Sequence, residues 1–127
     1  DAVETVERFR RAGLGQTVLS ASEQTMLRRQ LALYGLDSRF DAILGRGDIY
    51  AGSKEAIGRE YLQGSGVPAE AAVMIGDSLH DAEVARALGT RCILVARGHQ
   101  SRETLLEAGV PVVDSLRKAA DWVLEQQ

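Results

Sequence analysis

The chain has 127 residues, is 45% hydrophobic and carries a formal net charge of −3. A chain of this length forms one core that buries about two thirds of its unfolded surface, so we expect a single domain over residues 1–127. Its charges are of mixed sign, which argues against the strongly basic surface that nucleic acids and anionic lipids bind.

Helical and strand-like patterns alternate along the whole chain. Apolar residues at helical spacing mark the helices, and short apolar runs bounded by glycine or polar residues mark the strands. The expected elements, in chain order, are a helix over 3–9, a strand over 17–20, a helix from 20 to about 35, a strand over 42–44, a helix over 53–62, a strand over 73–75, a helix over 81–88, a strand over 92–95, a helix from 101, a strand over 111–113 and a helix from 116.

Local signals set several of these boundaries. Ser20-Ala21-Ser22-Glu23 has the pattern of a capping box, which predicts that a helix begins at Ser20. Gly35 and Gly89 follow helical patterns and are typical of helix ends.

This alternation is typical of parallel strands joined by right-handed helical crossovers. We therefore expect an α/β fold, a Rossmann-like three-layer α/β/α arrangement with helices on both faces of one mainly parallel sheet. The sequence contains no internal repeat, low-complexity tract or linker that would divide it.

Membrane and secretory signals are missing from the sequence. No apolar run approaches the about 18 residues that a membrane span requires, and the first residues are too polar for a signal peptide. The single cysteine, Cys92, lies in an apolar run, where we expect it to be buried and unreactive. One cysteine forms no internal disulfide, which fits a reducing compartment. The sequence thus predicts a soluble protein of the cytoplasm and leaves its oligomeric state open.

Two aspartates follow the apolar run 73–76. Asp77 comes directly after Gly76, and Asp81 lies four positions further on. A carboxylate at the carboxyl edge of an open α/β sheet lies where such folds bind ligands, and paired carboxylates suit a hard cation. The simpler interpretation is that Ser78 and Asp81 only cap the following helix. We expect Asp77 and Asp81 to bind a metal ion, and His80 to be a solvated residue of the first turn.

Phosphate-binding groups are expected in the first half of the chain. Ser20 offers a hydroxyl at a strand end, and the backbone amides of Ala21 and Ser22 could meet phosphate oxygens there. Lys54 heads a helix, where its ammonium group could stabilise the charge on a transferring phosphoryl group. The competing interpretations are a plain capping serine and an ordinary solvated lysine.

The chain closely resembles the haloacid dehalogenase-like superfamily. The resemblance lies in the order and spacing of three features, which are Ser20, Lys54 and the Gly-Asp-x-x-x-Asp motif at 76–81. Its members are mostly Mg²⁺-dependent phosphatases, and the likeness is greatest to the phosphoglycolate phosphatase-like branch. The resemblance implies that Ser20 binds phosphoryl oxygens and that Lys54, a catalytic residue, holds phosphate and nucleophile together. It also implies that Asp77, helped by Asp81, binds Mg²⁺. The expected substrate is a small phosphorylated metabolite similar to phosphoglycolate.

The sequence departs from the superfamily at its first motif. Members attack phosphate with the first aspartate of Asp-x-Asp-x-Thr/Val, whereas residues 1–5 match this pattern only at their ends, and Val3 belongs to a helical pattern. We therefore expect these residues to be the carboxyl-terminal part of a longer phosphatase, without the first strand and the cap. Such a chain would be inactive alone, because the aspartyl phosphate forms only in the full-length parent.

Other functions fit the sequence less well. A non-catalytic domain that keeps the phosphate pocket and has lost hydrolysis is the main alternative. A receiver-like signalling domain would carry its acidic pair early and its lysine late, the reverse of the order here. A P-loop NTPase is excluded because Gly-x-x-x-x-Gly-Lys-Ser/Thr does not occur.

Overall fold

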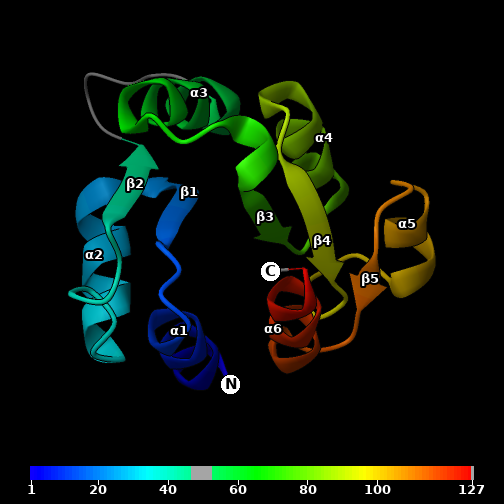
Figure 1. Ribbon diagram of the computed structural model, residues 1–127, viewed down its shortest axis with the longest axis horizontal. Coiled ribbons are helices and arrows are strands. Elements are labelled where there is room, and N and C mark those ends of the chain that lie inside the picture. Colours follow the sequence, from blue (N-terminus) through cyan, green and yellow to red (C-terminus); the bar gives the residue numbers. More distant parts are fainter. Residues whose placement is uncertain (47–52, 127) are drawn as a thin grey trace. The chain divides into compact units, whose positions relative to one another are not determined.

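The computed structural model describes residues 1–46 and 53–126. It divides into two compact units, Asp1–Tyr61 and Leu62–Gln127, and Figure 1 shows the elements of both. All paired strands run parallel, which confirms the α/β class. The elements are α1 (Ala2–Arg11), β1 (Thr17–Glu23), α2 (Gln24–Leu33), β2 (Ala42–Arg46), α3 (Lys54–Ser65), a 3₁₀ turn η1 (Ala69–Ala71), β3 (Val73–Gly76), α4 (Leu79–Leu88), β4 (Arg91–Val95), α5 (Arg102–Leu106), β5 (Val112–Val113) and α6 (Leu116–Glu125).

The first unit is built around the pair of strands β1 and β2. Thr17 pairs with Ala42, and the register continues through Leu19 and Leu44. Helix α2 connects the two strands and packs against both of them. Apolar residues at helical spacing on α1 and α2 supply half of the core, as the sequence pattern predicts. The buried apolar residues of this unit are Val6, Phe9, Leu27, Leu36, Ile43 and Ile57.

The second unit has a three-stranded parallel sheet in the order β3-β4-β5. Figure 1 shows β4 between its two partners. Cys92 and Leu94 of β4 pack in one cluster with residues of α4 and α5. Because side chains alternate along a strand, Ile93 and Val95 point to the opposite face, and α6 also packs against β4. The helices thus cover both faces of this sheet, which is the expected layered arrangement.

One expectation about the sheet is wrong. The described strands form two sheets, β1-β2 and β3-β4-β5, rather than one. Each strand pairs only with its neighbour along the chain, through a connection that contains a helix. In the superfamily that the sequence resembles, a further strand lies between those that end in the serine and in the first aspartate. The single domain over 1–127 stays a prediction.

The expected capping box at Ser20 is also wrong. Strand β1 continues to Glu23, and α2 begins at Gln24. The Ser20 Oγ accepts a hydrogen bond from the Ser22 amide at 3.1 Å, so it caps no helix. Serine side chains make such short-range bonds to the backbone in competition with helix formation, which is why the pattern is ambiguous in sequence.

None of the described helices combines the length and the apolar character that crossing a membrane requires.

Candidate functional site

Ser20 lies in an irregular part of β1. Leu19 pairs with Leu44 and Glu23 with Arg46, so four steps along β1 correspond to two along β2. Three residues of β1, 20–22, thus stand opposite one residue of β2, Gly45. With the Ser20 oxygen accepting from the Ser22 amide, the hydroxyl hydrogen of Ser20 is the group that can still be donated to a ligand.

The side chain of Gln24 holds this irregular segment against β2. Its carboxamide donates to the Ile43 carbonyl at 2.9 Å and accepts from the Gly45 amide. Gly45 leaves room for the Gln24 carboxamide and for the backbone of Ser22. A methyl group at Gly45 would lie 2.8 Å from the Gln24 Oε1 and 2.8 Å from the Ser22 carbonyl oxygen. Residues 20–22 are therefore fixed near the carboxyl end of β2.

Lys54 is the first residue of α3, as the sequence indicates, and its side chain is partly buried. The preceding Ser53 caps the helix, since its Oγ accepts from the Ala56 amide at 3.3 Å. Because β1 and β2 are parallel, Ser20 lies toward the edge of this sheet at which β2 ends. The first unit thus carries both predicted phosphate-binding side chains.

Asp81 lies in the first turn of α4 and is only 6% exposed. Its Oδ2 accepts from the Asp77 amide at 3.0 Å and from the Ser78 hydroxyl at 3.1 Å. In return the Ser78 Oγ accepts from the Asp81 amide at 3.2 Å. Ser78 and Asp81 therefore cap α4 reciprocally, which confirms the capping interpretation of this pair.

Asp77 is in a different situation from Asp81. It follows β3 directly, and its side chain is exposed. Within the part of the chain that the structure describes, its carboxylate accepts no hydrogen bond and forms no ion pair. The capping of α4 is complete without it, so the Asp77 carboxylate remains available to a ligand.

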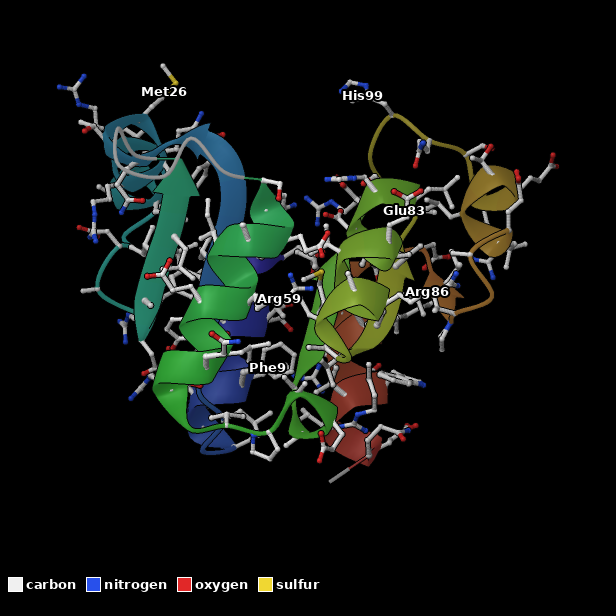
Figure 2. All side chains as sticks on the ribbon, turned by 90° about the horizontal axis from the view of Figure 1, so that it is seen from above. Phe9, Met26, Arg59, Glu83, Arg86 and His99 are labelled. Atoms are coloured by element: carbon white, nitrogen blue, oxygen red, sulfur yellow. The ribbon has the colours of Figure 1, made fainter. Side chains whose placement is uncertain are left out.

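Two residues that follow β4 belong to the same site and were missed in the sequence. The Gln100 Oε1 accepts from the Leu79 amide at 2.7 Å. Gly98 packs against Asp77, because a methyl group on Gly98 would lie 2.8 Å from the Asp77 Oδ2. Figure 2 shows His99 on the connection between β4 and α5. The sequence did offer a signal for these two residues, because they follow the apolar strand β4 closely. Since β3 and β4 are parallel, the residues that follow them lie at the same edge of the sheet.

The charge of Asp81 also acts on the core. Burial and the nearby Asp81 carboxylate raise the pKa of the Cys92 thiol to about 11. A thiol with this pKa stays protonated at neutral pH and is a poor nucleophile. The structure thus places Cys92 in the core, as the sequence indicates.

The few oxygen ligands in the second unit fit Mg²⁺ better than a metal ion that must be surrounded by protein side chains. Asp77 and Asp81 are adjacent, and among residues 1–46 and 53–126 no group of three or more His, Cys, Asp and Glu side chains gathers around a common point. Mg²⁺ usually keeps several waters and takes one or two carboxylates together with substrate phosphate. The exposed Asp77 carboxylate at the end of β3, with Asp81 close behind it, fits this requirement.

The chain is similar to known proteins of one hydrolase family. A family model described as HAD-hydrolase-like matches residues 18–119. A protein described as pyrophosphatase PpaX, from Caldanaerobacter subterraneus subsp. tengcongensis, is 30% identical over 99 residues, which are 75% of this chain and 44% of that protein.

Two solved structures extend the likeness to the fold. The crystal structure of a predicted phosphatase from Clostridium acetobutylicum has a TM-score of 0.88 and 26% identity, over 96% of this chain and 57% of that one. CbbY from Rhodobacter sphaeroides, crystallised with xylulose-(1,5)bisphosphate, has a TM-score of 0.75 and 28% identity, over 90% and 52% of the two chains. The chain thus spans about half the length of these relatives.

Proposed function

We propose that this chain, which belongs to the HAD-hydrolase-like family, is the phosphate- and metal-binding part of a phosphatase. The observation that carries the proposal is the Asp77 carboxylate. It stands exposed at the end of β3, while Ser78 and Asp81 complete the cap of α4 without it. An acidic side chain that is not needed for the helix is well suited to bind a cation.

In the first unit, we assign phosphate binding to Ser20, Ala21 and Lys54. The Ser20 hydroxyl hydrogen and the Ala21 amide would donate to phosphoryl oxygens. The Lys54 ammonium group would offset the negative charge that develops when the phosphoryl group transfers, which makes it the catalytic residue of this set. The position of Ser20 and Ala21 in the irregular last part of β1, and of Lys54 at the start of α3, supports this role.

In the second unit, Asp77 would bind Mg²⁺ through its carboxylate. Asp81 would act chiefly by holding the Asp77 amide at 3.0 Å, which fixes the backbone that carries the metal ligand. The bound ion would neutralise phosphoryl charge and orient the substrate. The choice of Mg²⁺ rests on the oxygen donors and on the family pattern.

The substrate we propose is the monoester of a small phosphorylated metabolite, as in the phosphoglycolate phosphatase-like branch. The nucleophilic aspartate of the superfamily motif does not occur in the 127 residues. Formation of the aspartyl phosphate is therefore proposed for the whole protein, in the cytoplasm, and not for this chain alone.

The assignment of Asp77 predicts a simple metal-binding phenotype. Asp77→Asn should weaken Mg²⁺ or Mn²⁺ binding at least about tenfold, because it removes the charged ligand. The melting temperature without metal should not change, since the carboxylate supports no described hydrogen bond. Isothermal titration with each metal measures the affinity, and thermal melts measure stability.

The matched control is Asp37→Asn, which neutralises an exposed aspartate in the first unit. It should keep the wild-type affinity. Equal metal affinities in the Asp77 and Asp37 variants would show that Asp77 is not the ligand and would refute the proposed site.

A further inference from the structure

The connection between β4 and α5 is anchored at both of its ends. At its start the Arg97 amide donates to the Val95 carbonyl at 3.0 Å, which makes a tight turn directly after β4. At its end Ser101 caps α5 by accepting from the Thr104 amide at 3.2 Å. Gly98, His99 and Gln100 lie between these two fixed points.

Gln100 joins this connection to the beginning of α4. Its Oε1 accepts from the amide of Leu79, the first residue of that helix, at 2.7 Å. The first amides of a helix have no partner within the helix, and here the partner comes from a residue 21 positions away. The contact therefore ties the connection to the residues next to Asp77.

Gly98 provides the surface against which the Asp77 carboxylate lies. A methyl group at Gly98 would stand 2.8 Å from the Asp77 Oδ2 and 3.0 Å from its Cγ. The backbone of Gly98 is not in the left-handed region, so its conformation does not require glycine. A methyl group at this position would instead force the exposed Asp77 side chain to move from its present position.

We propose that Gln100 and Gly98 are positioning residues for Asp77. The inference rests on the proposed metal-binding function of Asp77. Gln100 holds the connection on α4, and Gly98 then limits the directions in which the Asp77 carboxylate can turn. A ligand that is oriented before the ion arrives loses less conformational freedom on binding, so the affinity for the ion is higher.

Mn²⁺ titration of the 127-residue chain, followed by electron paramagnetic resonance, tests this role at a temperature where every variant is folded. Gln100→Leu should raise the dissociation constant about tenfold, since it cannot accept from Leu79. Gln100→Glu keeps an acceptor oxygen and adds a negative charge, so it should bind Mn²⁺ at least as tightly as the wild type. Gly98→Ala should also raise the dissociation constant about tenfold, because Asp77 must turn away from the new methyl group.

The control for the glycine variant is Gly64→Ala, where the added methyl group would meet no atom within 4 Å beyond the backbone of its own helix and its chain neighbours, so the affinity should not change. A merely structural Gln100 would lower the melting temperature of Gln100→Leu and leave its Mn²⁺ affinity at the wild-type value, which overturns the inference. Wild-type affinity in Gly98→Ala overturns it as well.

The experiment distinguishes failure of the metal site at Asp77 from failure of the positioning role of Gln100 and Gly98. If the wild type binds Mn²⁺ and Asp77→Asn does not, while both Gln100→Leu and Gly98→Ala bind normally, only the positioning role is refuted. If the wild type itself binds no Mn²⁺, the proposed metal site and the positioning role are refuted together.

Discussion

At the scale of single residues, the absence of a side chain at Gly76 leaves the space that the Asp81 side chain occupies. Asp81 is buried and folds back over the end of β3, where its Oδ2 accepts from the Asp77 amide. A methyl group at Gly76 would lie 2.6 Å from both the Cγ and the Oδ2 of Asp81. The glycine of the Gly-Asp-x-x-x-Asp motif is thus required by the second aspartate.

Gly76→Ala should lower the free energy of unfolding by about 1–3 kcal/mol, because the buried Asp81 side chain must shift. Urea unfolding followed by circular dichroism measures this loss. In Gly64→Ala the added methyl group meets no atom within 4 Å, and the change should be neutral or slightly stabilising in a helix. Equal midpoints for wild type and Gly76→Ala would contradict the close packing.

Cys92 gives a prediction for alkaline pH. The thiol pKa of about 11 in the folded chain lies above the ordinary value of 9.0, so the folded state holds this proton more tightly than the unfolded state. Its contribution to stability is therefore complete below about pH 9 and is lost as the pH rises toward about 11. The free energy of unfolding should fall less steeply over this range in Cys92→Ala than in the wild type. Urea unfolding at a series of pH values compares the two slopes, and parallel slopes would contradict the raised pKa.

At the scale of secondary-structure elements, β1 differs from an ordinary strand in its last residues. The pairing with β2 is regular to Leu19 and resumes only at Glu23. Between these points the side chain of Gln24 supplies hydrogen bonds to β2 on both sides of Leu44. One side chain at the start of α2 thus stabilises an interruption that places Ser20 for its proposed role.

Gln24→Ala should lower the free energy of unfolding by about 1–3 kcal/mol, because the Ile43 carbonyl and the Gly45 amide both lose their partner. The exposed Gln30 lies on the same helix, and Gln30→Ala serves as the control with almost no expected effect. Urea denaturation of the two variants provides the comparison. Equal stabilities would mean that the carboxamide of Gln24 does not support β2.

At the scale of the whole molecule, the chain carries two sets of groups in two compact units. The first unit contains Ser20 and Lys54, and the second contains Asp77 and Asp81. The chain covers 44–57% of the relatives named above. Binding functions can therefore be tested on the chain itself, whereas catalysis belongs to the proposed whole protein.

The 127-residue chain with Mg²⁺ should not hydrolyse para-nitrophenyl phosphate, because the superfamily's nucleophile motif is not in its sequence. Inorganic phosphate should still raise its melting temperature, since a ligand that binds only the folded state stabilises it. Lys54→Ala should abolish that increase. Lys118→Ala, which removes the only other lysine and an exposed ion pair with Asp114, should retain it. Turnover by the chain alone would contradict the requirement for an external nucleophile.

Local patterns explain why the cap of α4 could be predicted. The cap of α4 is encoded within four consecutive residues, and Ser78 with Asp81 makes the expected contacts. Ser20 shows the opposite case, because Ser-x-Ser-Glu is compatible with a helix cap and also with the short-range bond that forms here. The pairing of β1 with β2 selected the second conformation, and it involves residues more than 20 positions away.

The sequence by itself determined the order of helices and strands and the α/β class, because apolar periodicity and capping signals act over a few neighbouring residues. The family followed from the resemblance of its motifs in their order along the chain. Only the tertiary structure decided that Gln24 supports β2, that Gln100 meets Leu79 and that Gly98 faces Asp77. These contacts join residues 19–21 positions apart that no local pattern connects. They arise because parallel strands bring the residues that follow them to one edge of a sheet.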